Sequence, residues 1–302
     1  MVSPETSSAP RSYLYVPGDR PDRMASSAGR GADALILDLE DAVPAPAKAA
    51  ARGHVRTFLA GAPEGPQWWV RINAESLAED VADVTVGPQL SGIVLPKADP
   101  ALLAELDRRL SSAEAAAGLP ARSVRVLALI ESARGLLAAP RITTAPRVDR
   151  VGLGEADLAA ELGLQPGPDR EELWPLRSQI VVASAAAGIL PPVGPVETAV
   201  RDHERLVRTT ALLVRQGFRA RTAIHPDQVA VVNEAFTPSA EQVAAARDVL
   251  DRLAAAQERS AGVALTADGR FIDEAVARSA REVVGRDRGT TGTTRPDQQE
   301  EL

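Results

Sequence analysis

The chain has 302 residues, of which 45% are hydrophobic and 25% charged, and this composition excludes a wholly disordered, collagenous or coiled-coil protein. The formal net charge is -7, so the chain has no general basic surface for nucleic acid or for an anionic membrane. The length suits either one barrel-sized domain or two average domains.

The scarce residue types narrow the chemistry further. There is no cysteine, which excludes disulfides, thiolate nucleophiles and cysteine-ligated zinc. Lys48 and Lys97 are the only lysines, so they are the only candidates for a Schiff base. No stretch approaches about 18 continuous apolar residues, and the first residues lack the cationic start and apolar run of a leader. We therefore expect a cytoplasmic protein with neither nucleic acid nor membrane as a partner.

Short apolar segments recur along the chain and alternate with longer segments of helical spacing, such as residues 101–117 and 197–216. We expect strands at residues 13–16, 34–39, 68–72, 92–96, 124–130 and 150–154, a seventh near residues 190–196, where three prolines crowd the segment, and an eighth at residues 221–224. This alternation predicts an α/β fold with a parallel sheet.

Eight β-α units within roughly 235 residues favour a closed (β/α)₈ TIM barrel, whose usual size is about 250 residues. An open, doubly wound sheet is the alternative. Its dinucleotide fingerprint would place G-x-G-x-x-G after the first strand, whereas the turn there reads PGDRPDR. Dinucleotide binding is therefore disfavoured.

The residues after the barrel form a short appendage. We expect a helix at residues 239–259, a hairpin-like turn in ALTADGRFID and a last helix at residues 274–284. This segment is too small for a core of its own, so we expect it to pack on the barrel or on a neighbouring subunit. The predicted domains are a TIM-barrel catalytic domain at residues 11–235, a C-terminal lid segment at 236–285, and disordered ends at residues 1–10 and 286–302.

The active site of such a barrel lies at the C-terminal ends of its strands. Each predicted strand with a clear boundary is followed there by polar residues, among them Arg20, Glu40, Asp41, Arg71, Lys97, Glu131, Asp157 and His225. A single charged residue after a strand is ordinary for a protein surface. The prediction of an active site therefore rests on the complete ring of polar residues at the ends of the strands.

Two members of the ring are carboxylates that follow neighbouring strands. Glu131 ends an almost purely apolar strand, and Asp157 follows the next one. With open positions for water and substrate, such a pair suits Mg²⁺. The alternative is that each carboxylate caps the helix that comes after it.

Arg71 emerges from a buried strand and needs an anionic partner, which is Glu40 or Asp41, a substrate oxyanion, or both. We take Arg20 and Lys97 as further candidates for substrate binding. His225 is equally compatible with a structural role and with that of a catalytic base.

Eight sequence strings occur in order along the chain: VPGDRPDR, ALILDLEDAVP, VRIN, IVLPKAD, ALIESARG, GLGEADLAAELG, AIHPDQ and DGRFIDEAV. In order and spacing they resemble the citrate lyase beta-subunit-like and malyl-CoA lyase branch of the HpcH/HpaI aldolase superfamily, over about residues 11–284. The sister branch of pyruvate aldolases carries a histidine where this chain has Asp41. The segment ILPPVGPVETAV departs from the aspartate-containing seventh strand of the thioester branch and leaves Asp202 as the clear acidic match.

The resemblance implies a TIM barrel that forms a homotrimer or hexamer and holds Mg²⁺ through Glu131 and Asp157. It implies that Arg71 binds substrate and stabilises an enolate, with Glu40 and Asp41 holding metal-bound waters and orienting that arginine. Asp273 resembles the base that related lyases deliver on a C-terminal lid from an adjacent subunit.

The activity that the resemblance implies is a carbon–carbon lyase acting on a 3-hydroxyacyl-CoA thioester such as malyl-CoA or citramalyl-CoA. The products would be an acyl-CoA and a small 2-oxo acid, and water in the same site would hydrolyse the thioester. The alternatives are a metal-dependent aldolase of free 2-oxo acids and a non-catalytic barrel subunit. The sequence leaves the acyl group, the carrier and the physiological direction open.

Overall fold

The computed structural model describes residues 9–84, 87–258 and 264–288. The described residues divide into two compact units, a larger one within residues 10–236 and a smaller one within residues 237–288. Most of the two ends expected to be disordered, residues 1–8 and 289–302, lies outside the described residues.

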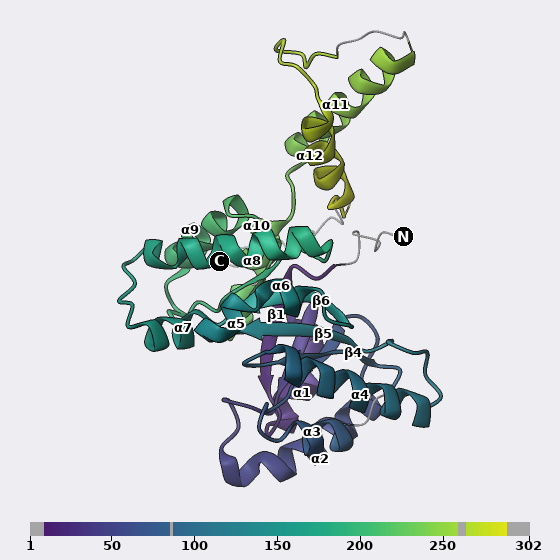
Figure 1. Cartoon of the computed structure of the whole chain (residues 1–302), viewed down its shortest axis with the longest axis vertical. Coiled ribbons are helices and arrows are strands. Elements are labelled where there is room, and N and C mark those ends of the chain that lie inside the picture. Colours follow the sequence, from purple (N-terminus) through teal and green to yellow (C-terminus); the bar gives the residue numbers. More distant parts are fainter. Residues whose placement is uncertain (1–8, 85–86, 259–263, 289–302) are drawn as a thin grey trace, which may run out of the picture. The chain divides into compact units, whose positions relative to one another are not determined.

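Residues 10–236, which run from purple to green in Figure 1, form a closed barrel of eight parallel strands in sequential order. In it β1 pairs with both β2 and β8. The pairing of β1 with β8 confirms the TIM barrel and excludes the open sheet. The strands are β1 (Ser12–Pro17), β2 (Ala34–Asp38), β3 (Gln67–Arg71), β4 (Leu90–Leu95), β5 (Arg125–Ile130), β6 (Val148–Leu153), β7 (Val193–Gly194) and β8 (Ala220–Ala223).

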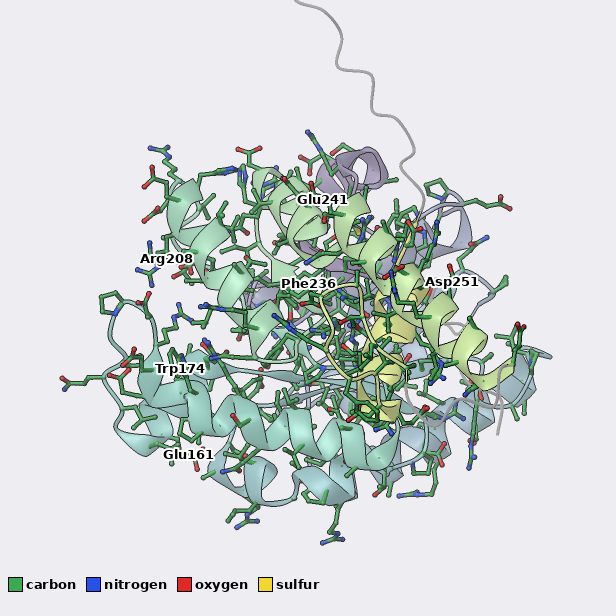
Figure 2. All side chains as sticks on the ribbon, turned by 90° about the horizontal axis from the view of Figure 1, so that it is seen from above. Glu161, Trp174, Arg208, Phe236, Glu241 and Asp251 are labelled. Atoms are coloured by element: carbon green, nitrogen blue, oxygen red, sulfur yellow. The ribbon has the colours of Figure 1, made fainter. Side chains whose placement is uncertain are left out.

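Helices follow the strands and form the outer layer of this unit, and charged side chains such as Glu161 and Arg208 extend from its surface (Figure 2). The α-helices are α1 (Pro21–Ser27), α2 (Lys48–Ala60), α3 (Leu77–Asp83), α4 (Pro100–Ala116), α5 (Ala133–Leu137), α6 (Ala139–Thr143), α7 (Glu155–Leu162), α8 (Trp174–Ala187), α9 (His203–Arg215) and α10 (Val229–Phe236). Short 3₁₀ turns are η2 (Ala28–Arg30), η3 (Ala45–Ala47), η4 (Glu171–Leu173) and η5 (Pro226–Gln228).

Two expectations around β7 were wrong in extent. The strand has two residues instead of the expected residues 190–196, because Pro191, Pro192 and Pro195 flank it and proline has no N–H for the ladder. Residues 197–202, expected to be helical, precede α9, which begins at His203. The helix starts there because the side chain of Asp202 accepts a hydrogen bond from the backbone N–H of Arg205 and so caps it.

The inside of the barrel is filled by one residue set and its outside by another, because successive side chains of a strand face opposite ways. The interior cluster consists of Tyr13, Ala34, Ile36, Trp69, Val94, Leu127, Leu129, Val193 and Ala220. Trp69 lies across β4 at Gly92, where a Cβ atom would be 2.3 Å from Cζ3 of the indole. Only glycine therefore leaves room for this ring. The larger cluster between sheet and helices includes Leu35, Leu37, Val70 and Ile93.

In the C-terminal unit, α11 (Ala240–Glu258) and α12 (Glu274–Gly285) lie side by side (Figure 1). Ala256, Ala264 and Ile272 make up its small buried cluster. Leu265 and Phe271 form an antiparallel bridge in the segment expected to be a hairpin-like turn. Across the described ranges, none of the helices has the length and apolar character needed to cross a membrane.

Glu114 in α4 is a buried carboxylate that fixes the chain before β5 and β6. It accepts hydrogen bonds from the backbone N–H groups of Arg122 and Val124, both at 2.9 Å, and from the two terminal nitrogens of Arg147 at 2.7 and 2.8 Å. Burial alone would raise the pKa of Glu114, but Arg147 and the two N–H groups outweigh burial and lower that pKa to about 2. The ionised form is therefore the one that stabilises the fold.

We expect Glu114→Gln to lower the free energy of unfolding by about 3–5 kcal/mol at neutral pH, because it removes the charge facing the buried guanidinium of Arg147. The pKa of Glu114 is lower in the folded than in the unfolded chain, so its contribution is complete above pH 4.5 and is lost as the pH falls toward 2. Urea unfolding between about pH 6 and about pH 3 measures the effect. A difference between wild type and variant that does not shrink on acidification contradicts this account.

Candidate active site

A cavity of about 710 Å³ lies at the end of the barrel where the strands finish. Its lining comes from the last residues of the strands and from the loops that follow them, which is where a barrel of this kind carries its active site. The polar and charged residues in the lining are Tyr15, Asp38, Asp41, Arg71, Glu131, Glu155, Asp157, Arg170, Thr198, Arg205 and Thr222.

The alternation of side chains along the strands explains how charged residues reach this cavity. Interior apolar residues of β2, β3 and β5 are Ile36, Trp69 and Leu129. The residues two positions further along face the same way, and they are Asp38, Arg71 and Glu131. The site is therefore the last interior layer of the barrel, in which charged side chains take the place of apolar ones.

Arg71 is the central cation of this layer. Its Nε and one terminal nitrogen donate to the two carboxylate oxygens of Asp38, both at 2.6 Å, and its other terminal nitrogen lies 3.0 Å from Glu40 and 3.2 Å from Asp41. The ring of Tyr15 lies 4.7 Å from the guanidinium carbon. The expected pairing with Glu40 and Asp41 is present, but the main partner, Asp38, was missed. The signal for Asp38 was its place two residues after the interior Ile36.

Burial and mutual charge set the protonation of these groups. Burial lowers the pKa of Arg71, but Asp38, Tyr15 and Glu40 outweigh it, so that pKa is raised and the guanidinium stays charged. Burial raises the pKa of Glu40 to about 7 against the opposing effect of Arg71. Burial also raises the pKa of Glu131 to about 7, with a contribution from the negative charge of Asp157. Several carboxylates thus share one buried cation, an arrangement that favours a further positive charge in the cavity.

Glu131 is held by backbone on two sides. Its carboxylate accepts a hydrogen bond of 2.9 Å from the backbone N–H of Lys97, a residue whose φ of 48° is in the left-handed region. On another side, a Cβ atom at Gly154 would lie 2.4 Å from Cγ of Glu131, so only glycine fits there. The helix that follows is capped by Ser132, whose hydroxyl accepts from the N–H of Gly135. The alternative that Glu131 caps this helix was therefore wrong.

Asp157 lies in the first turn of α7 and lines the same cavity as Glu131. The N-cap of α7 is Gly154, so Asp157 does not cap this helix either. Within the described ranges, no group of three or more histidines, aspartates and glutamates is placed to hold a metal ion. Two carboxylates beside open volume are nevertheless the donor set that suits Mg²⁺, which keeps several waters and takes other ligands from its substrate.

Three of the remaining candidates, Arg20, Lys97 and His225, are not among the residues that line the cavity. Arg20 pairs with Asp22 at the exposed start of α1, and the side chain of Lys97 is exposed while its backbone serves Glu131. His225 accepts a hydrogen bond from the N–H of Asp227 and caps η5, which is a structural role. Asp273 belongs to the C-terminal unit, where it N-caps α12 by accepting from the N–H of Val276 at 2.8 Å.

Sequence reasoning also missed two cavity-lining cations, Arg170 before η4 and Arg205 on α9. Arg170 ion-pairs with Glu155, and Arg205 ion-pairs with Glu197. These partners are separated from them by loops, so no local pattern in the sequence joins them.

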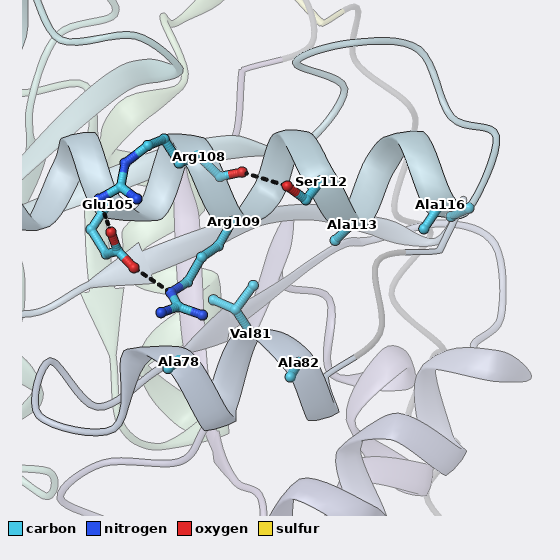
Figure 3. Close-up of a pocket in the computed structure, with 10 residues that line it drawn as sticks. Ala78, Val81, Ala82, Glu105, Arg108, Arg109, Ser112, Ala113 and Ala116 are labelled. Atoms are coloured by element: carbon cyan, nitrogen blue, oxygen red, sulfur yellow. Dashed lines mark hydrogen bonds and ion pairs between the residues drawn. The ribbon is translucent and has the colours of Figure 1, made fainter.

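A second hollow lies between α3 and α4 on the outer layer (Figure 3). Half of its lining residues are alanines, and its two arginines, Arg108 and Arg109, both pair with Glu105 of the same helix. The carboxylate pair that suits a metal lies in the barrel cavity, which is therefore the candidate active site.

The chain is similar to known proteins over most of its length. The family model described as HpcH/HpaI aldolase/citrate lyase matches residues 11–226. A citrate lyase subunit beta-like protein of Deinococcus radiodurans is 34% identical over 285 residues, which cover 91% of this chain and 96% of the relative. The L-malyl-CoA/beta-methylmalyl-CoA lyase of Cereibacter sphaeroides is 33% identical over 301 residues, covering 91% and 93%.

The chain is also similar to solved structures. The crystal structure of CitE from Mycobacterium tuberculosis, in complex with magnesium, acetoacetate and coenzyme A, superposes with a TM-score of 0.74 at 33% sequence identity. The match covers 92% of this chain and 98% of that one.

We expect Asp38→Asn to destabilise the fold by about 3–5 kcal/mol, because it removes the main anionic partner of a buried guanidinium. Asp41→Asn is the matched control. The side chain of Asp41 is 78% exposed, so its loss should cost under about 1 kcal/mol. Urea unfolding of both variants measures the difference. Equal effects would show that Asp38 is not the residue that holds Arg71.

Proposed function

The chain belongs to the HpcH/HpaI aldolase/citrate lyase family, and on that premise we propose that it is a Mg²⁺-dependent carbon–carbon lyase acting on a CoA thioester. The substrate class is a 3-hydroxyacyl-CoA such as malyl-CoA or citramalyl-CoA, and the products are an acyl-CoA and a small 2-oxo acid. The observation that carries the proposal is the pair Glu131 and Asp157 in one cavity with Arg71.

Glu131 and Asp157 would hold the metal ion. A bound Mg²⁺ supplies Lewis acidity toward the carboxylate and carbonyl oxygens of the 2-oxo acid. The backbone around Glu131 fixes the direction of its carboxylate: the N–H of Lys97 donates to it, and Gly154, which has no Cβ, leaves room for its side chain. A ligand held in this way is ready for the ion before the ion arrives, which lowers the cost of ordering the site.

Arg71 is proposed to bind the thioester and to stabilise its enolate oxygen. In the condensing direction, loss of an α-proton places negative charge on the thioester oxygen, and in the cleaving direction the same charge develops as the carbon–carbon bond breaks. Asp38 and Tyr15 hold the guanidinium charged and in one place. A donor fixed before the reaction stabilises an enolate oxygen without reorganising. Asp41, whose side chain is exposed, contacts the terminal nitrogen that also lies 3.0 Å from Glu40, and we propose that substrate takes the place of Asp41 there.

Glu40 and Asp41 are proposed to position Arg71 and the waters around the metal. Lys48 supports this loop, since its ammonium donates to the backbone carbonyls of Leu39 at 3.0 Å and Glu40 at 3.2 Å. Arg20 and Lys97 remain proposed contacts for the anionic groups of the substrate.

Asp273 is the proposed base. In the condensing direction its carboxylate takes the α-proton of the acyl thioester, and the alkoxide oxygen left by carbon–carbon bond formation is then protonated to the 3-hydroxyl. In the cleaving direction the 3-hydroxyl loses its proton, the carbon–carbon bond breaks, and the acid form of Asp273 protonates the α-carbon of the enolate. We propose that it is delivered to the cavity of a neighbouring subunit in a homotrimer or hexamer. The segment that carries it exposes Leu265 and Phe271 by 49% and 56%, apolar surface that a partner would cover.

We expect Mg²⁺ to raise the melting temperature of the wild-type protein by mass action, and Glu131→Gln and Asp157→Asn to lose that rise. Glu161→Gln is the control, because Glu161 lies one turn beyond Asp157 on α7 and bonds to the backbone of Ala133. Thermal melts with and without Mg²⁺ measure the shift.

Assays of acyl-CoAs against glyoxylate and pyruvate test the lyase activity itself. Mg²⁺-dependent turnover in Glu131→Gln or Asp157→Asn would overturn the assignment of these two residues as metal ligands.

We expect Asp273→Asn to reduce turnover by about 10²–10⁴-fold with little change in melting, because asparagine can replace aspartate as an N-cap but not as a base. Mixing Asp273→Ala subunits with Arg71→Ala subunits tests delivery from a neighbour. Mixed oligomers should recover activity if base and arginine come from different chains. Full activity in Asp273→Asn would reduce Asp273 to its capping role.

A further inference from the structure

A cluster of charged side chains forms one part of the cavity wall, outside the group around Arg71. Glu155 pairs with Arg177 at 2.6 Å and with Arg170 at 3.0 Å. Glu197 lies 3.2 Å from Arg205, 3.5 Å from Arg221 and 3.9 Å from Arg170. In the described part of the chain, these ion pairs join four guanidinium groups to two carboxylates.

The cluster therefore carries more positive than negative charge. Both carboxylates are buried, with side-chain exposures of 2% for Glu155 and 1% for Glu197. Burial lowers the pKa of Arg221, Glu197 raises it, and Arg170 and Arg177 lower it, with the net result that this pKa falls to about 10. An excess of cations in a low-dielectric wall is costly unless an anion joins it.

The two buried arginines already use their donors. All three nitrogens of Arg177 donate hydrogen bonds, to Glu155 and to Gln216. Arg221 donates to the carbonyl of Pro195 and to the hydroxyls of Thr209 and Thr210. These two side chains are structural members of the cluster.

The two arginines that line the cavity keep unused donors. Arg170 makes a single side-chain hydrogen bond among the described residues, from one terminal nitrogen to Glu155 at 3.0 Å. In the part of the chain that the structure describes, the terminal nitrogens of Arg205 donate no hydrogen bond, while its buried Nε lies 3.2 Å from Glu197 without hydrogen-bond geometry. Both side chains reach the cavity, with exposures of 19% and 30%. Spare guanidinium donors beside a net positive charge are the chemistry that binds an oxyanion.

We infer that Arg170 and Arg205 form an anion subsite of this cavity, separate from the Glu131 and Asp157 pair, which takes a second oxyanion of the substrate. The inference rests on the proposed function. Two groups of a CoA-ester reaction have this chemistry, the second carboxylate of a dicarboxylic 2-oxo acid and a phosphate of the CoA carrier. The first would select dicarboxylic over monocarboxylic acids, and the second would anchor the thioester.

Arg205→Gln tests the subsite because Glu197 keeps Arg221 and Arg170 as partners when Arg205 is lost. Arg208→Gln is the matched control. Arg208 lies on the same helix, projects outward (Figure 2) and pairs with Asp169, with 55% of its side chain exposed. Arg170→Gln is the second test variant, should Arg205→Gln fail to fold.

Binding is measured by calorimetry in the presence of Mg²⁺ with two pairs of probes. Oxaloacetate and pyruvate differ by one carboxylate, and CoA and pantetheine differ by the 3′-phospho-ADP group, which carries all the phosphates of CoA. Arg205→Gln should weaken either oxaloacetate or CoA by about tenfold or more, the size expected for a lost charge-assisted contact, and leave the matching pyruvate or pantetheine within about twofold. The affected pair identifies which oxyanion occupies the subsite.

The outcomes separate this inference from the proposed function. If the wild type binds the probes and neither Arg205→Gln nor Arg170→Gln differs from Arg208→Gln, the subsite is overturned while the lyase proposal stands. If the wild type binds none of the four probes with Mg²⁺ present, the proposed function and the subsite fall together.

Discussion

The pairing of Arg71 with Asp38 is the interaction on which the rest of the site depends. The two residues are register partners at the ends of β3 and β2, and two hydrogen bonds of 2.6 Å join their side chains. The same carboxylate accepts from the backbone N–H groups of Glu40 at 2.9 Å and Ala42 at 3.0 Å. Arg71 thus holds the carboxylate of Asp38, and that carboxylate holds the loop that presents Glu40. The ion pair that stabilises the fold therefore also positions residues of the candidate site.

Support for that loop extends outward through polar contacts. Lys48 on α2 bonds to the side chain of Asn73 as well as to the backbone of the loop. Asn73 in turn donates from its backbone and its side chain to the buried carboxylate of Asp80, at 2.7 and 2.8 Å, and Arg52 pairs with the same carboxylate. In this network the buried side chains of Asn73 and Asp80 both have hydrogen-bond partners, which allows these polar groups to lie close to the core.

Much of this architecture is readable from the sequence. The short apolar runs in ALILD and QWWVR predict strands buried on both faces, and Arg71 at the end of the second strand is predicted to need an anionic partner. What the sequence hides is partner choice. Asp38, Glu40 and Asp41 are near neighbours in the chain, and only the closed barrel shows that Asp38 is the one that pairs twice with Arg71. The arginine cluster is hidden more completely, because Arg170 and Glu197 are brought together only by tertiary packing.

The shortness of β7 has a mechanical consequence. Its register with β6 is a single pair, Gly152 with Val193, so the backbone ladder is thinnest at this place in the barrel. Side chains support β7 on both sides. On the β6 side, Arg150 donates to the carbonyl of Pro191 at 2.6 Å. On the β8 side, Arg221 donates to the carbonyl of Pro195 and Thr222 to that of Gly194. A seam closed by side chains opens at lower cost than one closed by a full ladder. An anion bound to the arginines along this seam would also tighten it, so ligand occupancy and barrel rigidity would rise together.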